Sequence, residues 1–400
     1  MNFQEARKLY PGLKDKVFLD AACVSLIPQT AKQEIENFLQ MALECPARDA
    51  SFHHIAMDTW RQKTVLETAK LFNVEEGRIA LVESTTHGLN IAANCIPFEK
   101  NDEILIIDTE FLQVAIPFSK KEEQHQLKII AVEGRQDKSV DLPMLLEKVS
   151  KKTKAICISS VQWCSGYRFS MQELGDFCRE RGIWLIVDAV HEAGVLNIDA
   201  NKRYADFLIT GGHKWLNAPF GCGMMILSSK ALQLSPSSYG YLALEEPTGG
   251  WGAFFQDPTQ TPFRQYNYPR TAKQFEIAGT SNYPGAIGLR ETIKIVNQLS
   301  VAKVEEYVLS LGQFLQKELT KLNFNVVSSK DPKHQSAITV FRAFDTPEKD
   351  RMLLEKLLDE KIFASIRYTA NRGGIRISTH YYNNQEDILK LCHTIKKIIA

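Results

Sequence analysis

Short apolar segments alternate with amphipathic segments between residues 78 and 228. The apolar segments are "RIALVES", "DEILIID", "LKIIAVE", "KAICISS", "GIWLIVD", "DFLIT" and "GMMILS". Between several of them lie stretches such as "SMQELGDFCRERG", which have the spacing of an amphipathic helix. The apolar segments are hydrophobic throughout rather than alternating, as in strands covered on both sides. The pattern therefore predicts an α/β domain with a mostly parallel, seven-stranded sheet.

The pattern changes after residue 228. Residues 229–282 are rich in Gly, Pro and aromatic residues and predict long loops, which usually serve a function such as covering a site. Their aromatic side chains suit a substrate pocket and a dimer interface equally well. A long helical tract follows, from "GAIGL" to "ELTKL", and the remainder, with "SAITVFRA" and "GIRIST", predicts a smaller α+β domain. We place the large domain at residues 15–284 and the small domain at residues 1–14 and 285–400.

Composition and charge are those of an ordinary globular protein. The 400 residues are 44% hydrophobic and 24% charged, and the net charge of +1 gives no argument for binding nucleic acid or an anionic membrane. No apolar run reaches the roughly 18 residues of a membrane span. The start, "MNFQEARKLYPGLKDK", lacks the apolar stretch of a secretion signal, so we expect a cytoplasmic protein. The eight cysteines form no C-x-x-C pair, so we expect neither a disulfide framework nor a metal site.

Polar residues stand at one strand-to-helix junction, in "LVESTTHGLN". Ligands of open parallel sheets bind at the carboxyl ends of the strands. The hydroxyls of Ser84, Thr85 and Thr86, together with the backbone N–H groups of a helix start, suit a phosphate. The alternative is that Ser84 or Thr85 only caps the helix.

Two ionisable residues, Asp188 and Lys214, lie at the ends of apolar segments. Asp188 closes "LIVD" and is followed by His191, while Lys214 lies in "DFLITGGHKW". A buried carboxylate is costly unless it is paired, so a structural Asp–Lys ion pair is one interpretation. A group of phosphate-binding hydroxyls, a carboxylate and a lysine at a strand end together match what pyridoxal 5′-phosphate (PLP) requires. The lysine would form a Schiff base with the aldehyde, and the carboxylate would keep the pyridine nitrogen protonated.

The motifs resemble those of one known family. "HKW", "VDAVHEAG" and "AGTSNYPGAIGL" at this spacing look like the class V branch of fold-type I PLP enzymes. That branch includes cysteine desulfurases, selenocysteine lyases, cystine lyases and isopenicillin-N-epimerase-like proteins. The resemblance runs from "VFLDAACVSLIP" to "GIRISTHYYNNQEDI" and so covers nearly the whole chain. It implies the fold-type I PLP-dependent transferase fold, with the large and small domains given above.

The resemblance implies three catalytic residues, Lys214, Asp188 and His191. Lys214 would hold the cofactor aldehyde, Asp188 would pair with the pyridine nitrogen, and His191 would lie near the phenolic oxygen. The full set of implied cofactor-binding residues is Ser84, Thr85, Thr86, Phe111, Gln162, Asp188, His191, His213, Lys214 and Thr280.

The other members of this set have implied roles of their own. Thr85, Thr86 and His213 would contact the phosphate. Phe111 of "EFLQVAIPF" falls where the family places a ring that stacks on the cofactor. Gln162 of "SSVQW" would approach the phenolic oxygen.

Three further residues concern the substrate and the subunit contact. Arg376 of "GIRIST" would hold the α-carboxylate of an amino-acid substrate, which suits the forked guanidinium, and Ala22 would also contact the substrate. Thr280 of "FEIAGTSNYPG" would reach the phosphate of the neighbouring subunit, which implies a homodimer. No nucleic-acid or membrane partner is expected.

The sequence departs from the family pattern in two places. Cysteine desulfurases carry a catalytic cysteine on a loop shortly before the carboxylate-binding arginine, whereas "EKIFASIRYTANRGGIRIS" contains none. Cys164 of "QWCSG" is close to the expected site, and we interpret it as a packing residue, with a nucleophilic role as the alternative. Gly211 stands where many relatives have a serine that donates to the phosphate, so Thr210 or the backbone N–H would replace it.

We therefore expect a PLP-dependent C–S lyase that eliminates a β-substituent from a cysteine-like amino acid without a persulfide cysteine. An amino-acid epimerase or an aminotransferase is the alternative, because all three reactions begin with loss of the α-proton to Lys214. A further alternative is a protein that binds PLP without catalysis, but the joint presence of Lys214, Asp188 and Arg376 argues against it.

Overall fold

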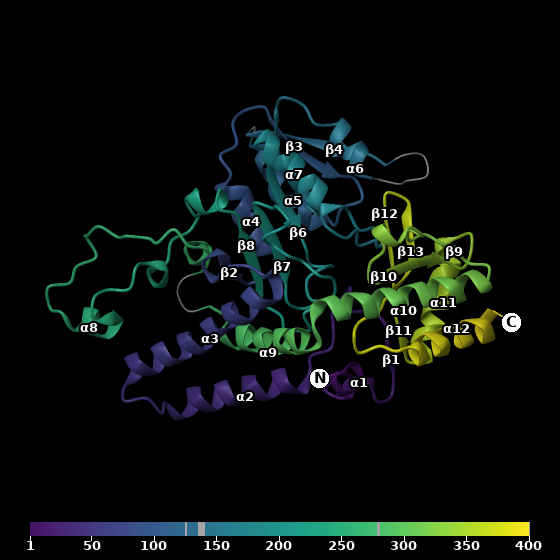
Figure 1. Ribbon diagram of the computed structural model, residues 1–400, viewed down its shortest axis with the longest axis horizontal. Coiled ribbons are helices and arrows are strands. Elements are labelled where there is room, and N and C mark those ends of the chain that lie inside the picture. Colours follow the sequence, from purple (N-terminus) through teal and green to yellow (C-terminus); the bar gives the residue numbers. More distant parts are fainter. Residues whose placement is uncertain (125, 135–140, 278–280, 400) are drawn as a thin grey trace.

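A seven-stranded sheet forms the centre of the protein (Figure 1). The computed structural model describes residues 1–124, 126–134, 141–277 and 281–399. In sheet order the strands are β2 (Ile79–Val82), β8 (Gly223–Leu227), β7 (Phe207–Gly211), β6 (Trp184–Asp188), β5 (Thr153–Ser159), β3 (Asp102–Ile107) and β4 (Leu127–Val132). Neighbouring strands are parallel except that β8 is antiparallel to both β2 and β7. The predicted fold, a mostly parallel seven-stranded sheet, is confirmed.

Both faces of the central strands are covered by apolar side chains. Alternate residues of β5 belong to two separate clusters, with Ile156 and Ile158 in one and Ala155 and Cys157 in the other. Every residue of β6, β7 and β8 is buried. The edge strand β4 differs, because Lys128 is exposed there. Burial on two faces explains why most of these strands show continuous apolar runs.

Helices follow the strands in the order that the alternation predicts. They are α4 (Thr85–Cys95) after β2, α5 (Leu112–Glu123) after β3, α6 (Leu142–Glu147) after β4 and α7 (Met171–Arg181) after β5. Each of these helices carries the chain back along the sheet, so that the next strand runs in the same direction. The carboxyl ends of the parallel strands therefore lie at the same end of the sheet.

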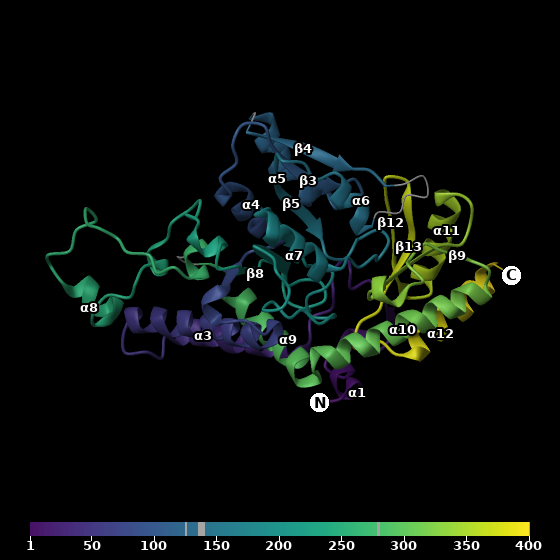
Figure 2. The same ribbon diagram turned by 45° about the horizontal axis from the view of Figure 1, so that its top comes forward.

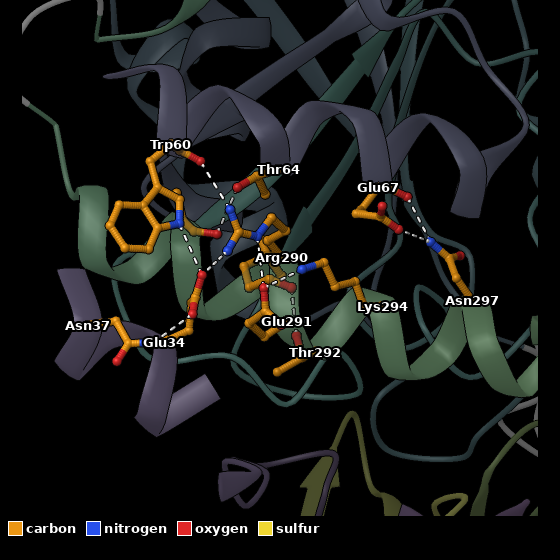
Figure 3. Close-up of polar contacts among 12 residues, drawn as sticks. Glu34, Asn37, Trp60, Thr64, Glu67, Arg290, Glu291, Thr292, Lys294 and Asn297 are labelled. Carbon is orange, nitrogen blue, oxygen red and sulfur yellow. Dashed lines mark hydrogen bonds and ion pairs between the residues drawn. The ribbon is translucent and has the colours of Figure 1, made fainter. Parts of the chain in front are cut away.

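Three long helices pack together beside the sheet, namely α2 (Gln29–Glu44), α3 (Ala50–Phe72) and α9 (Tyr283–Leu299). Figure 3 shows their polar contacts. Buried Arg290 of α9 forms an ion pair with Glu34 of α2 at 2.5 Å, and Trp60 of α3 donates to the same carboxylate at 3.1 Å. Asn297 of α9 donates to the carbonyl oxygen of Glu67 at 3.1 Å. These contacts join a segment before the sheet to one that follows it.

The predicted long helical tract is two helices in the structure. Helix α9 ends at Leu299, and α10 (Val301–Lys321) begins at Val301. Ser300 between them has φ 67° and ψ 116°, which a helix cannot accommodate. The break directs the chain from α2 and α3 to the C-terminal region (Figure 1).

The C-terminal region contains a second, antiparallel sheet. Its strands, in sheet order, are β12 (Ser365–Thr369), β13 (Arg372–Ser378), β10 (Ile338–Arg342) and β9 (Asn325–Val326). Helices α10, α11 (Pro347–Asp359) and α12 (Gln385–Ile399) pack with it. The predicted α+β character of this part is confirmed.

The start of the chain associates with this C-terminal region. Strand β1 (Val17–Phe18) pairs in parallel with β11 (Ile362–Phe363). Arg7 of α1 (Phe3–Arg7) pairs with Asp387 of α12 at 2.8 Å. The domain limits given above stay a prediction.

Residues 229–277 include a segment that extends away from the sheet in both ribbon views (Figures 1 and 2). It contains the turns and loops that the sequence predicts. It also carries the short helix α8 (Gly250–Gln256), which the sequence does not predict. Tyr241 packs edge-to-face on Trp251 with ring centres 5.4 Å apart, whereas Phe263 is 92% exposed. The two interpretations of these aromatic side chains, pocket or dimer interface, stay predictions.

Candidate active site

A cavity of about 360 Å³ opens at the carboxyl ends of β6 and β7, where the sequence predicts ligand binding. The predicted site residues in its wall are Ala22, Ser84, Thr85, Thr86, Phe111, Asp188, His191, His213, Lys214 and Arg376. The rest of its wall is Cys23, Gln113, Trp163, Val190 and Arg367. Residues from the start of the chain, the central sheet and the C-terminal sheet thus meet at one place.

The amino end of α4 forms one part of the wall. Ser84 is the N-cap of this helix, and its Oγ accepts a hydrogen bond from the backbone N–H of His87 at 3.1 Å. Thr85 Oγ1 is buried and has no hydrogen-bond partner among the described residues. Buried hydroxyls without a partner are uncommon. Ser84 therefore caps the helix, while the Thr85 hydroxyl stays open to a ligand at an end of the helix that favours anions.

Gly211 leaves space beside this hydroxyl. A Cβ at this position would lie 3.1 Å from Thr85 Oγ1 and 3.1 Å from His213 Nδ1. Thr210, the alternative donor, uses its Oγ1 to donate to the carbonyl oxygen of Gly211 at 3.1 Å, and it does not line the cavity. An unpartnered hydroxyl next to an open cradle fits a phosphate group.

Asp188 ends β6 at the floor of the cavity and is 4% exposed. Its Oδ1 accepts a hydrogen bond from the backbone N–H of Val190 at 2.9 Å. Burial raises the pKa of this carboxyl, and the positive charge of Lys214 opposes the rise. A carboxylate held in this way favours a cation in the cavity, such as a protonated ring nitrogen.

Lys214 follows β7, and its amine opens onto the same cavity. Burial lowers the pKa of this amine to about 8, while Asp188 opposes the effect and Arg376 adds to it. Lys214 Nζ lies 3.3 Å from His191 Nε2 and 5.9 Å from the centre of the Phe111 ring. With this pKa about a tenth of the amine is uncharged at pH 7 and about half at pH 8, and the uncharged form is the one that a nucleophile or a base requires.

Arg376 brings a positive charge from β13 to the cavity. Its side chain is 2% exposed, with Nη2 3.4 Å from Asp20 Oδ1 and Nη1 donating to the carbonyl oxygen of Trp163 at 3.2 Å. Its Nε is buried without a partner among the described residues. The guanidinium is therefore fixed in position and retains an N–H group that can bind a carboxylate.

The hairpin that carries Arg376 is tight. Strands β12 and β13 pair from Ser365 opposite Arg376 to Thr369 opposite Arg372. The turn between them is Ala370 and Asn371, with φ 46° and 62°, as in a two-residue type I′ hairpin. The segment before Arg376 therefore has no loop that could carry a thiol, in agreement with its lack of cysteine.

The profile of the family described as Aminotransferase class-V matches residues 17–391. The chain belongs to the class V aminotransferase family. Its relatives include an uncharacterized aminotransferase of Schizosaccharomyces pombe, 29% identical over 84% of this chain and 82% of the relative. A probable cysteine desulfurase of Pyrococcus abyssi is 23% identical, with 99% and 97% covered. Isopenicillin N epimerase of Streptomyces clavuligerus is 23% identical, with 96% of each chain covered.

Solved structures of other proteins share the fold of this chain. The apo cysteine desulfurase of Thermococcus onnurineus NA1 has a TM-score of 0.83 at 21% identity, covering 99% of this chain and 97% of that one. The cystine C–S lyase C-DES, in complex with its product cysteine persulfide, has a TM-score of 0.83 at 22% identity, covering 96% and 98%. A lysine-to-alanine mutant of C-DES holds glycine covalently linked to the PLP cofactor.

The family and its structural relatives identify PLP as the cofactor, so this member of the class V aminotransferase family is a PLP-dependent enzyme. The cavity fits this cofactor on two observations. The unpartnered Thr85 hydroxyl beside Gly211 suits its phosphate, and buried Asp188 suits its ring nitrogen. The alternative of a PLP-binding protein without catalysis is thereby set aside.

Two predicted cofactor residues remain, and one of them, Gln162, does not line the cavity. Gln162 is buried, and its amide bonds to neighbours: Oε1 accepts from Thr109 Oγ1 at 2.9 Å and Nε2 donates to Glu110 at 2.8 Å. Its contact with the phenolic oxygen of the cofactor stays a prediction. Thr280, with its predicted reach to a neighbouring subunit, lies outside the described residues.

The sequence analysis did not identify Cys23 and Arg367. Arg367 lies on β12, beside the strand of Arg376, and its Nη2 donates to Cys23 Sγ at 3.4 Å. Cys23 directly follows Ala22 in "LDAAC", and the repeated "SIR" and "GIR" of the two strands could have indicated Arg367. Cys164 is not in the wall, and burial raises the pKa of its thiol to about 12, as expected for a packing residue.

Two further properties concern the described residues. None of their helices combines the length and hydrophobicity that crossing a membrane requires. Nor do they contain a group of three or more His, Cys, Asp or Glu side chains arranged to hold a metal ion.

Proposed function

We propose that this enzyme is a C–S lyase that acts on a cysteine-like amino acid. One observation carries the proposal: the cavity joins Lys214 and Asp188 to Arg376, while the hairpin before Arg376 offers no thiol to take up sulfur. The shared fold with a cystine C–S lyase supports this class of reaction. Without a thiol at that hairpin, the β-substituent leaves into solution.

Three ionisable residues, Arg376, Lys214 and Asp188, have different roles in this proposal. The guanidinium of Arg376, held by Asp20 and the Trp163 carbonyl, binds the α-carboxylate of the substrate. The uncharged amine of Lys214 removes the proton from Cα. When bound, PLP delocalises the negative charge that develops at Cα. Asp188 keeps the ring nitrogen of the cofactor protonated and so favours that delocalisation.

The phosphate end is held by uncharged donors and a histidine. Ser84 and Thr86 flank Thr85 at the amino end of α4, and His213 lies next to Gly211. Ala22 lines the same cavity as Arg376, and in this proposal it contacts the substrate. We also propose a homodimer in which Thr280 contacts the phosphate of the partner subunit.

The direct test is incubation of the PLP-loaded enzyme with cysteine, cystine and common amino acids. We expect pyruvate together with sulfide or a persulfide from the sulfur-containing substrates, and no product from the Lys214→Ala variant. Exchange of the α-proton with solvent, without pyruvate, would contradict the lyase. Transfer of the amino group to a keto acid would instead identify an aminotransferase.

An amino-acid epimerase is the second candidate. The similarity to isopenicillin N epimerase extends over nearly the full length of both chains. The Cys23 thiol in the cavity wall offers a proton donor distinct from Lys214. Inversion of the substrate's configuration, lost in the Cys23→Ala variant, would support this candidate over the lyase.

A further inference from the structure

Trp215 links the active-site histidine to the protein interior. Its indole Nε1 donates to His191 Nδ1 at 3.4 Å, and His191 Nε2 lies 3.3 Å from Lys214 Nζ. Trp215 is fully buried and His191 is 4% exposed, so water does not compete for these contacts. The lysine, the histidine and the indole therefore form one continuous chain.

The indole ring is fixed from its other side by the C-terminal region. His380 stacks on it, with ring centres 5.6 Å apart, and His380 Nε2 contacts the carbonyl oxygen of Trp215 at 2.9 Å. His380 Nδ1 accepts from the backbone N–H of Tyr381 at 2.8 Å, so the ring proton is on Nε2, which donates to that carbonyl. With its ring stacked and its backbone held, Trp215 cannot turn its N–H away from His191.

The hydrogen bond from the Trp215 indole determines which ring nitrogen of His191 carries the proton. An indole N–H can only donate, so His191 Nδ1 must accept. Burial lowers the pKa of His191 well below its usual value, and the charges of Lys214 and Arg376 act in the same direction. A neutral imidazole carries one proton, which must then be on Nε2, facing Lys214.

An Nε2–H group facing Lys214 favours the uncharged amine. The neutral amine has a lone pair that accepts this bond, whereas an ammonium group would place two donors against each other. We propose that Trp215 is a positioning residue whose indole N–H fixes the Nε2–H tautomer of His191 and thereby favours the uncharged form of the Lys214 amine. The inference rests on the proposed function, because that function uses Lys214 as a base.

Other groups also act on this pair. The titratable and charged side chains around Lys214 are Asp188 of β6, Arg367 of β12, Arg376 of β13 and Cys23 after β1. His213 and Arg376 act on His191 in addition to Lys214. All of them are unchanged by a substitution at Trp215, so a difference in tautomer between the native enzyme and a Trp215 variant reports on the indole alone.

The first test measures the tautomer in the cofactor-free enzyme, where Lys214 carries a free amine, by ¹⁵N NMR of labelled histidine, with the His191 signal assigned from its loss in His191→Gln. We expect Nδ1 unprotonated and Nε2 protonated. In Trp215→Phe, which removes the donor but keeps an aromatic ring, we expect a mixture of tautomers. The control is Trp184→Phe, the same type of substitution at the start of β6, which should leave the signal unchanged. A protonated Nδ1 in the native enzyme would overturn the inference, even if Trp215→Phe does not fold.

A second test follows the rate of PLP capture by the cofactor-free chain as a function of pH. With the tautomer released, a bare Nε2 can accept from the ammonium group, so the midpoint for Trp215→Phe should rise by about one pH unit. An unchanged midpoint would contradict the inference. Neither test depends on turnover, so a failed lyase assay with the expected tautomer would reject only the proposed reaction, whereas a lyase with the wrong tautomer would reject only this inference.

Discussion

Two buried aspartates, each with a lysine nearby, lie at opposite ends of neighbouring parallel strands. Asp188 ends β6 beside Lys214, and Asp206 precedes β7 beside Lys230, with Lys230 Nζ 3.7 Å from Asp206 Oδ2. In the sequence the two look alike, because each aspartate adjoins a short apolar segment. The structure separates them by what surrounds each carboxylate.

The Asp206 carboxylate accepts several hydrogen bonds from protein groups. Its oxygens accept from Tyr204 Oη at 2.7 Å, from Ser228 Oγ at 2.7 Å and from the backbone N–H of Leu185 at 3.0 Å. Asp188 accepts from Val190 N–H and otherwise faces a cavity. A carboxylate whose partners are all protein groups stabilises the fold, whereas one left open at a cavity is available for chemistry.

The largest difference should appear when the two lysines are replaced. Lys214→Ala should lower turnover about 10³-fold or more, because it removes both the cofactor anchor and the base. Lys230→Ala should leave turnover within about twofold, since its partially exposed amine contacts Asp206, the Gly182 carbonyl oxygen and the Trp184 ring, none of which lines the cavity. Steady-state kinetics of PLP-loaded variants, with borohydride trapping and mass spectrometry to locate the reduced lysine, would check this. A label on any lysine other than Lys214 would contradict the comparison.

Replacing the two aspartates should affect stability more at Asp206 than at Asp188, whereas turnover should be affected more at Asp188. Asp206→Ala removes the acceptor of the Leu185 N–H and of the Tyr204 and Ser228 hydroxyl groups and should lower the free energy of unfolding by about 3 kcal/mol. Asp188→Ala removes a buried acid with few partners and should change it by less than about 1 kcal/mol, while turnover falls strongly. Urea denaturation of the cofactor-free variants measures both. Equal destabilisation by the two changes would show that Asp188 is structural as well.

The effect of pH is the smallest of the three and concerns Lys214 alone. Its folded pKa of about 8 lies below the usual value, so the amine gains a proton as the pH falls through 8. The rate of PLP capture by the cofactor-free chain should therefore rise about tenfold from pH 7 to 9 and then level off. An ordinary lysine would give a rate that still increases at pH 10. Absorbance of the bound cofactor after rapid mixing provides the measurement, and a rise continuing beyond pH 9.5 would contradict the lowered pKa.

Much of the fold could be predicted from local pattern. Strands such as "GIWLIVD" and "GMMILS" are buried on both faces, so their hydrophobic runs are continuous and easy to recognise. The break at Ser300 could not be predicted, because the residues on either side continue the same helical spacing. It arises where α9 ends its packing on α3 and the chain turns toward the C-terminal sheet.

Residues of the candidate site could be predicted where they belong to a recognisable sequence motif. Asp188 ends β6 and Lys214 follows β7, whereas Arg376 lies within β13, and the arrangement of the two sheets brings the three side chains to one cavity. The choice between Ser84 and Thr85 as helix cap was open in the sequence, since both hydroxyls stand at the same junction. Only the hydrogen bond from His87 to Ser84 decides it.

The sequence by itself determined the order of strands and helices, the cofactor class and the absence of a cysteine before Arg376. These follow from local spacing and residue type. The tertiary structure alone decided the partners of polar atoms at the site, such as the approach of Arg367 to Cys23 and of the Trp215 indole to His191. Such partners come from distant parts of the chain, and their contacts depend on side-chain directions that no local pattern specifies.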